Sequence, residues 1–438
     1  MNPTTQHPVV IVGGGIAGLV SAALVARAGL PAVVLEKASA TGGRAATREK
    51  NGFRFNLGPH ALYRHGALSD MLRQLGVEVT GAVPGGNGGF AIRGGRRHTL
   101  PVGLTSLMTT SVMGLPAKFE FARLQRLIAS ADASGLQGKT LESWLQSALH
   151  HDEVRDLVRM LVRVTTFTND PQRQSAGAAI DQLRLAFSGN VLYLNGGWQT
   201  VVDGLRRVAV ASGVRIESGA HAVALERRDA RSIGAVRLAD GRHVPASSVI
   251  VAATPEDVDA LSGVTQFAGT LTPVRVATLD LALTSLPQRK RIVAFGADEP
   301  TYFSVHSAVA RLAPEGGALI HVAKYLGPDE IAGRDVERTL EQLADDMQPG
   351  WRNVIAAKYF LPSLTVTNAE LVASSGGLAG RPSPRVAAFD NVFVAGDWVG
   401  SRGQLSDAAA ASAADAAEAV VSRRSSVISP AVVSPAVA

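Results

Sequence analysis

The stretch VVIVGGGIAGLVSAALVARAGLPAVVLEKASATGGR, residues 9–44, reads as an apolar strand, a glycine turn, a helix rich in Ala, Val and Leu, and a second apolar strand that ends in an acid. Gly13, Gly15 and Gly18 stand at the three positions of G-x-G-x-x-G, where a strand turns sharply into a helix against a phosphate. Gly13 permits the turn, Gly15 lets the backbone approach a pyrophosphate, and Gly18 lets the helix lie close to the strand. This order predicts a dinucleotide-binding βαβ unit and therefore an α/β fold.

Two further residues indicate how the nucleotide is held. Glu36 ends the second strand, where its carboxylate can accept hydrogen bonds from the adenosine ribose. Arg44 follows Gly43, and from there a guanidinium can reach back to a pyrophosphate at the helix N-terminus. Residues 9–26 could instead be an apolar transmembrane or signal segment. Four interior glycines, the acid-ended second strand and the lack of basic residues before the run argue against that alternative.

With these residues the chain resembles the flavin-containing amine oxidase superfamily, whose first βαβ unit carries the glycine turn, the ribose acid and a following GGR. The resemblance implies FAD rather than NAD. It points to the phytoene desaturase and protoporphyrinogen oxidase branch, although Asn56 stands where Asp is usual. The matching segments are GFRFNLGPHALY (52–63), LNGGWQTVVDGL (194–205), VIVAATP (249–255) and NVFVAGDWVG (391–400).

The resemblance also implies roles for residues outside the first unit. Gly58 lies in the segment beside the isoalloxazine, Val223 meets the adenine through its backbone, and Gly396-Asp397 binds the ribityl chain. Residues 406–421 form a strong helix by propensity, with Ser406 as a candidate N-cap. In the family this helix points its positive end at the flavin pyrimidine ring. A plain surface helix is the alternative.

The rest of the chain predicts a discontinuous, Rossmann-like FAD-binding domain with an inserted α+β substrate domain, made of a mixed sheet and a helical cap. The FAD-binding parts are expected at 1–85, 190–268 and 385–424, and the substrate-binding parts at 86–189 and 269–384. Glycines 94 and 95 predict a hairpin over 88–101. Helical spacing marks 117–133, 139–149, 152–166 and 173–187, and alternation within 271–325 predicts several strands, which could form the floor of a substrate cavity.

Composition restricts the class of protein. The 438 residues contain no cysteine, which excludes disulfides, thiolate metal sites and a cysteinyl link to a flavin. We therefore expect noncovalent FAD, unless a histidine carries a link, and no metal. The lack of cysteine is compatible with a reducing cytoplasm, where we expect the protein.

Charge leaves the question of a membrane open. A net charge of +6 could favour an anionic membrane surface, but the basic residues are scattered, and a solvated, mildly basic surface is the better explanation. They form no basic–aromatic stripe of the kind that binds nucleic acid. From Ser422 the chain shows no helical period, and we expect residues 425–438 to be disordered. A peripheral membrane anchor is the alternative for this tail.

His60 is the candidate catalytic residue. It follows Gly58-Pro59, in the segment that the resemblance places beside the flavin, and a histidine there could move a proton at neutral pH. The alternative is a histidine that only binds backbone in a tight loop. Four further side chains are either pocket walls or packing, namely Trp198, Tyr302, Phe303 and His306.

A lysine that many amine oxidases place on a substrate-domain strand has no clear counterpart. The corresponding stretch, 271–283, contains Arg275 and no lysine, and Lys324 fits the motif poorly. An always-charged guanidinium does not replace a tunable amine. This lowers the expectation of an amine oxidase.

We expect an FAD-dependent oxidoreductase that removes two hydrogens from a small apolar organic substrate by hydride transfer to flavin N5. The bond is expected to be a C–C bond of an isoprenoid or related secondary metabolite, with oxygen or a quinone as electron acceptor. Three alternatives remain. They are oxidation of a C–N bond in an amine or amino acid with hydrogen peroxide as product, a non-catalytic binding protein of the GDP-dissociation-inhibitor type, and a redox-neutral flavin mutase that needs an arginine pair in its cavity.

Overall fold

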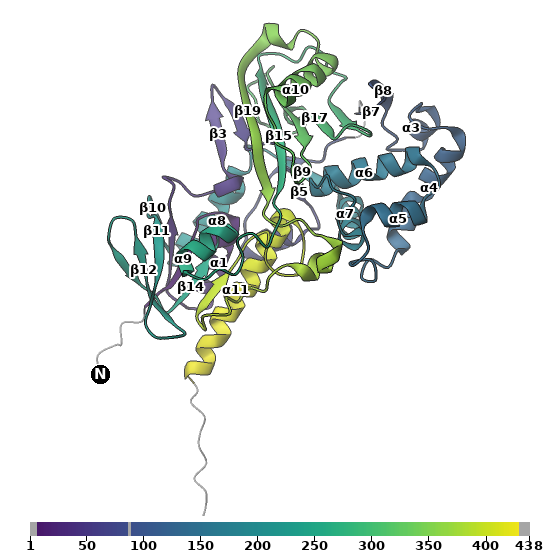
Figure 1. The fold of residues 1–438 in the computed structure, drawn as a ribbon. Coiled ribbons are helices and arrows are strands. Elements are labelled where there is room, and N and C mark those ends of the chain that lie inside the picture. Colours follow the sequence, from purple (N-terminus) through teal and green to yellow (C-terminus); the bar gives the residue numbers. More distant parts are fainter. Residues whose placement is uncertain (1–6, 86–88, 429–438) are drawn as a thin grey trace, which may run out of the picture.

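A five-stranded parallel sheet organises the N-terminal βαβ unit. The computed structural model describes residues 7–85 and 89–428. The strand order is β10-β2-β1-β14-β20, so segments far apart in the chain lie side by side (Figure 1). The strands are β1 (Val9–Val12), β2 (Ala32–Glu36), β10 (Arg215–Ser218), β14 (Ser248–Val251) and β20 (Val392–Val394).

Helices cover one face of this sheet and a small antiparallel sheet covers the other. Because the central strands are buried on both sides, successive residues enter two different cores. Ile11 packs with the helices, whereas Val10 and Val12 pack on the opposite side. The helices are α1 (Ile16–Arg27), α2 (Ala67–Leu75), α8 (Gln199–Ala211) and α11 (Leu405–Ile428). The opposite layer contains β11 (Ala222–Arg227), β12 (Ile233–Leu238), β13 (His243–Pro245) and α9 (Pro255–Ser262).

A seven-stranded mixed sheet forms the second large layer. Its order is β19-β15-β18-β17-β16-β7-β8, and α10 (Arg334–Met347) covers one face. The strands expected within 271–325 are present as β15 to β18, and β19 is one that the sequence did not indicate. The strands are β7 (Gly89–Arg93), β8 (Arg96–Thr99), β15 (Val274–Leu283), β16 (Val293–Gly296), β17 (Thr301–Val305), β18 (Ala318–Tyr325) and β19 (Ile355–Thr367).

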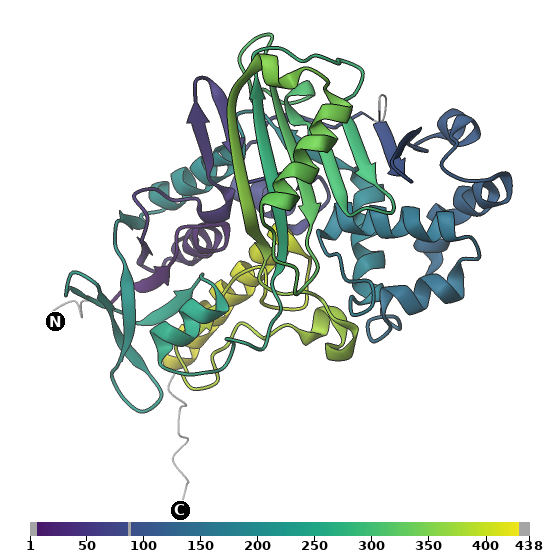
Figure 2. The ribbon, with the colours of Figure 1, turned by 45° about the horizontal axis from the view of Figure 1, so that its top comes forward.

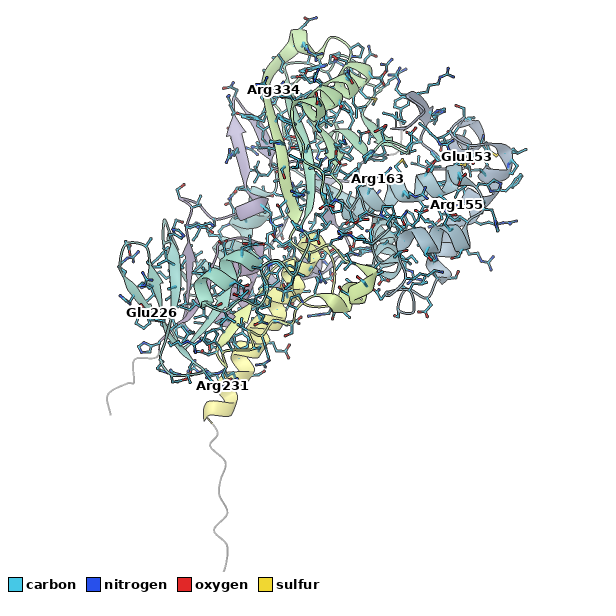
Figure 3. The ribbon with its side chains drawn as sticks, in the orientation of Figure 1. Glu153, Arg155, Arg163, Glu226, Arg231 and Arg334 are labelled. Carbon is cyan, nitrogen blue, oxygen red and sulfur yellow. The ribbon has the colours of Figure 1, made fainter. Side chains whose placement is uncertain are left out.

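A helical cap packs at one end of this sheet (Figure 2). The hairpin turn at Gly94-Gly95 and the four predicted helices are confirmed. The helix α6 has the predicted bounds 152–166, the other three have shifted ends, and α3 is additional. Arg163 joins the cap to the sheet, because its guanidinium donates to the carbonyls of Gly296 and Ala297 at 2.9 Å each (Figure 3). The cap helices are α3 (Leu104–Thr109), α4 (Leu115–Ser130), α5 (Leu141–Ala148), α6 (Asp152–Thr166) and α7 (Ala176–Gly189).

Short strands connect these layers. A hairpin pairs β3 (Thr47–Lys50) with β4 (Phe53–Asn56). The strand β9 (Val191–Leu194) pairs with β5 (Leu62–Tyr63) and β6 (Gly81–Ala82). Among the described residues, no helix is both long enough and apolar enough to cross a bilayer.

The last helix differs from its prediction at both ends. It begins at Leu405, so Ser406 lies inside the first turn and is not the N-cap. It continues to Ile428, whereas no regular structure was expected beyond Ser422. The remainder of the predicted tail, residues 429–438, lies outside the described residues. The domain boundaries stay predictions.

We predict that Gly18→Ala lowers the free energy of unfolding by about 2–3 kcal/mol, because overpacking would push α1 off β1. The added Cβ would lie 1.8 Å from the carbonyl oxygen of Gly13. Gly138→Ala is the matched control, since a Cβ there meets no atom within 4 Å. Urea denaturation followed by circular dichroism measures both variants. Equal midpoints for the two would contradict the packing role of Gly18.

Candidate functional site

A cavity of about 720 Å³ is lined by residues of both large sheets. Its lining runs from the glycine turn after β1 to the first turn of α11, so it collects residues from almost the whole chain. Ten predicted site residues line it, namely Gly13, Gly15, Glu36, Gly43, Arg44, His60, Val223, Gly396, Asp397 and Ser406. Gly18 and Gly58 do not line the cavity and act through packing.

The glycine turn leaves the N-terminus of α1 open toward the cavity. Gly13 has φ +105°, which favours glycine, and its N–H donates to the carbonyl of Leu35 at 2.8 Å. Gly15 is the N-cap of α1, and no side chain caps the helix. A Cβ on Gly15 would meet only the carbonyl of Gly42, at 3.9 Å, so the space that a side chain would fill is free. Unpaired N–H groups at a helix N-terminus attract an anion.

Glu36 is fixed at the end of β2 by two backbone groups. Its carboxylate oxygens accept hydrogen bonds from the N–H groups of Gly14 and Ala38, each at 2.7 Å. The side chain is buried and lines the cavity at the same time. Each oxygen keeps a lone pair with which it can accept a ligand hydroxyl.

Arg44 and Asp397 form an ion pair of 2.6 Å. Arg44 also donates to the carbonyl of Val366 at 2.8 Å, and the buried Asp397 carboxylate accepts from Asn368 at 3.0 Å. Burial lowers the pKa of the Arg44 guanidinium, but the charge of Asp397 and its hydrogen bond outweigh this and raise the pKa overall. The pair brings together two predicted residues that are 353 positions apart.

Arg381 holds the backbone around Asp397 in place. Its guanidinium donates to the carbonyls of Asp397, Arg402 and Gly403 at 3.0, 3.2 and 2.8 Å. Burial lowers the pKa of Arg381 to about 10, against the opposing effect of Asp397. Arg381 and Asn368 belong to no motif, so the sequence does not indicate their roles.

His60 lines the cavity beside the backbone of Arg44, and we call the lining around it the His60 end. Its Nδ1 lies 3.1 Å from the carbonyl oxygen of Gly58, and its ring lies 5.2 Å from that of Trp198. Burial lowers the pKa of His60 to about 4, and hydrogen bonds to the backbone of Gly58 and Arg44 oppose this only in part. The imidazole is therefore neutral near pH 7. Other lining side chains at this end are Tyr63, Phe167, Val276 and Leu364.

Gly58 lets this loop lie against the seven-stranded sheet. Its φ is +75°, and a Cβ there would lie 3.0 Å from the side chains of Thr278 and Leu364. Any other residue would therefore be strained and would press on β15 and β19. The packing of Gly58 holds His60 at the cavity wall.

A buried chain of polar side chains lies on the face of the seven-stranded sheet opposite α10. His321 Nδ1 lies 2.7 Å from an oxygen of Asp280, and His306 Nε2 lies 3.0 Å from the hydroxyl of Tyr302. The Tyr302 hydroxyl is 3.2 Å from that of Tyr193. Tyr302, Phe303 and His306 are buried and do not line the cavity, so packing is the correct interpretation for these three, whereas Trp198 is a wall.

Neither candidate for the amine oxidase lysine lines the cavity. Arg275 donates to the carbonyl of Pro328 at 2.6 Å, and Lys324 pairs with Glu330 at 2.5 Å. Of the lysines in the described part of the chain, Lys37 alone lines the cavity, beside Glu36. Within the same residues, no group of three or more His, Asp or Glu side chains could hold a metal ion.

Residues 16–421 match the family described as flavin containing amine oxidoreductases. The chain belongs to this family. A relative in sequence is phytoene desaturase of Fusarium fujikuroi, which is 25% identical over 287 residues, or 56% of this chain and 49% of the desaturase. The chain spans about half the length of the curated relatives that it matches.

Two solved structures show that this chain shares its fold with known proteins. A proposed protoporphyrinogen oxidase from Exiguobacterium sp. 255-15 superposes with a TM-score of 0.73 at 19% identity, covering 96% of this chain and 99% of that one. Putrescine oxidase bound to putrescine superposes with a TM-score of 0.72 at 17% identity, covering 96% and 100%. The predicted family and α/β fold class are therefore confirmed. The roles of single residues remain predictions.

The lowered pKa of His60 predicts a pH-dependent contribution to stability. Between pH 6.5 and about 4 the unfolded chain binds a proton that the folded protein does not, so stability should fall as the pH drops through this window. We predict that the difference in unfolding free energy, wild type minus His60→Gln, decreases by about 2 kcal/mol between pH 7.5 and 5.0. Urea titrations at both pH values measure it. The difference between wild type and His60→Phe should decrease by the same amount over this pH range. A difference that does not change with pH would refute the lowered pKa of His60.

Proposed function

We propose that the protein binds FAD noncovalently and removes two hydrogens from a small apolar organic substrate. The observation that carries this proposal is the open N-terminus of α1 beside Gly15, with Arg44 at the cavity wall. A helix N-terminus and a guanidinium together suit a pyrophosphate. Glu36 and Val223 would hold the adenosine, and Asp397 the ribityl hydroxyls.

Entry of the cofactor would change the partners of two residues. In the structure, the charges of Arg44 and Asp397 neutralise each other in an ion pair at the cavity wall. With FAD present, the Arg44 guanidinium would bind the pyrophosphate, and the Asp397 carboxylate would accept from ribityl hydroxyls. Charge-assisted hydrogen bonds of this kind are stronger than neutral ones.

The composition of the His60 end supports an apolar substrate. The carboxylates that line the cavity are Glu36, Asp257 and Asp397, and none of them comes from the segments around His60. Tyr63, Phe167, Val276 and Leu364 present apolar surface there. These segments contribute no carboxylate to the lining, and Asp397 is already paired with Arg44, so we favour C–C desaturation over C–N oxidation. We propose an isoprenoid or related metabolite as substrate.

His60 is proposed as the group that accepts the substrate proton. Bound FAD would supply the chemistry of accepting a hydride at N5 from a substrate C–H bond. The second hydrogen would leave as a proton, and the neutral imidazole of His60 can take it. The apolar walls exclude water from the reacting carbon atoms. Oxygen or a quinone is the proposed electron acceptor.

The alternatives lack a specific supporting observation. A non-catalytic binding protein of the GDP-dissociation-inhibitor type would not need the intact turn, ribose acid and Arg44–Asp397 pair. A flavin mutase needs two arginines in the cavity, and in the described residues Arg44 is the arginine that lines it. The likeness to putrescine oxidase extends to the fold alone at 17% identity.

The test begins with the visible spectrum of the purified protein. Flavin bands should be present, and denaturation should release the flavin into the supernatant because it is not covalently bound. Anaerobic addition of isoprenoid, porphyrinogen and amine panels should bleach the bands with the apolar classes. Bleaching by amines alone would replace the substrate proposal. A colourless protein that FAD cannot reconstitute would support the binding-protein alternative.

Two variants test the cofactor assignment. Glu36→Ala and Asp397→Ala should each weaken FAD binding about 10- to 100-fold, because each removes charge-assisted hydrogen bonds. Asp240→Ala is the control, since this residue lies on the surface and pairs with Arg242. Flavin content after dialysis and fluorescence titration of the stripped protein measure the effect. Full retention of FAD by both variants would show that the assignment is wrong.

A separate variant tests the role of His60. We predict that His60→Ala keeps normal flavin content but slows flavin reduction by a true substrate about 10²- to 10⁴-fold, the usual range for loss of a general base. Anaerobic stopped-flow absorbance measures the reduction rate. If the rate is unchanged, His60 only packs the loop.

A further inference from the structure

We propose that the outer end of the helical cap docks on an anionic lipid bilayer. Five large apolar side chains are exposed there within residues 102–119. They are Val102, Leu104, Met108, Leu115 and Phe119, with exposed fractions of 57, 78, 59, 59 and 64%. Outside this stretch, no described segment of the same length exposes more than two large hydrophobic side chains. We call these residues the α3–α4 surface.

The exposed side chains lie on two helices that contact each other. Leu104 and Met108 are four residues apart on α3, as are Leu115 and Phe119 on α4, so each pair shares a helix face. The Lys118 ammonium donates to the carbonyl of Met108 at 2.7 Å and ties the end of α3 to the first turns of α4. The opposite faces of the helices fill the cap core, so these exposed side chains are not needed for packing within the chain.

The charges of the neighbouring residues indicate which kind of partner fits the α3–α4 surface. Residues 94–119 contain no acidic residue. On α4, Arg123 and Arg126 follow Phe119 by four and seven positions, so they continue the apolar face with positive charge. Both are exposed, and neither forms an ion pair with any residue that the structure describes.

The nearest acid in the sequence, Glu120, forms its ion pair with His151 and not with either arginine. Glu120 turns its carboxylate toward the backbone N–H groups of His150 and His151, at 2.7 and 3.0 Å. Apolar side chains flanked by free cations suit acyl chains beneath anionic headgroups. A second copy of the chain would bring the same positive charge to the contact, so it fits this surface less well.

The position of the α3–α4 surface is suitable for docking. Figures 1 and 2 place α3 and α4 at the end of the cap that is remote from the five-stranded sheet. The end of α11 lies on the far side of the molecule, so docking through the cap does not involve it (Figure 1). Within the cap, α6 packs against α4 and is followed by Phe167 at the cavity wall. The proposal does not depend on the flavin chemistry.

Co-sedimentation of the full-length protein with lipid vesicles tests the proposal. We expect binding to vesicles of phosphatidylcholine and phosphatidylglycerol (7:3) that weakens at high salt and on pure phosphatidylcholine. The double variant Leu104→Glu/Phe119→Glu should lower the partition coefficient about tenfold or more, since it removes buried apolar area. Arg123→Glu/Arg126→Glu should remove the preference for anionic vesicles. Ile331→Glu is the matched control, because Ile331 is 90% exposed and lies outside the surface.

Each outcome decides the proposal. Absence of wild-type binding to both vesicle types would overturn it, as would equal loss in the Ile331→Glu control. Binding that survives both double variants would assign the contact to another part of the chain. A wild-type dimer that only the apolar double variant dissociates, without lipid binding, would make the surface a contact between copies. Circular dichroism and the flavin spectrum verify that each variant is folded. A loss of vesicle binding with an unchanged flavin spectrum can therefore be distinguished from a failure of the proposed function.

Discussion

The close packing of α1 on β1 is the contact on which the site depends. It requires Gly18, because a side chain there would overlap the carbonyl of Gly13. The packing sets the N-terminus of α1 at the carboxyl ends of the parallel strands, which all end at one edge of the sheet. Ala252 follows β14 and Gly396 follows β20 at the same edge, so residues from three distant segments converge around one anion-binding helix end.

The predictable parts of the fold and of the site are those that carry a local signal. The glycine turn, the hairpin at Gly94-Gly95 and the alternating strand 274–283 each encode their conformation in neighbouring residues. The strand β19 does not, because it is partly exposed and contains Pro362, and pairing with β15 decides its place. It supplies Leu364 to the cavity. Asn368 and Arg381 were missed for a similar reason, since contacts with Asp397 define their roles.

In the seven-stranded sheet, the alternating sequence pattern predicts the strands but does not determine whether side chains fill a face of the sheet. The strands expected to form a cavity floor are present, but aromatic and polar side chains fill much of that face. His306 stacks on Tyr193 at 3.9 Å, and His321 is held by Asp280. From β15 the cavity receives Val276. Periodicity specifies which residues share a face, whereas side-chain volume across several strands determines whether the face encloses space.

The last helix completes the nucleotide domain, and this has a consequence for how the protein is made. The Ser21 hydroxyl in α1 donates to the carbonyl of Ala413 in α11 at 3.3 Å, across 392 positions of sequence. On the ribosome, β1 and β2 emerge long before β14 and β20, whereas the contiguous helices α3–α7 can pack together as they appear. The nascent chain therefore carries an open, apolar half-sheet until β14 and β20 have been synthesised. Its cofactor pocket is complete only after α11 has been synthesised.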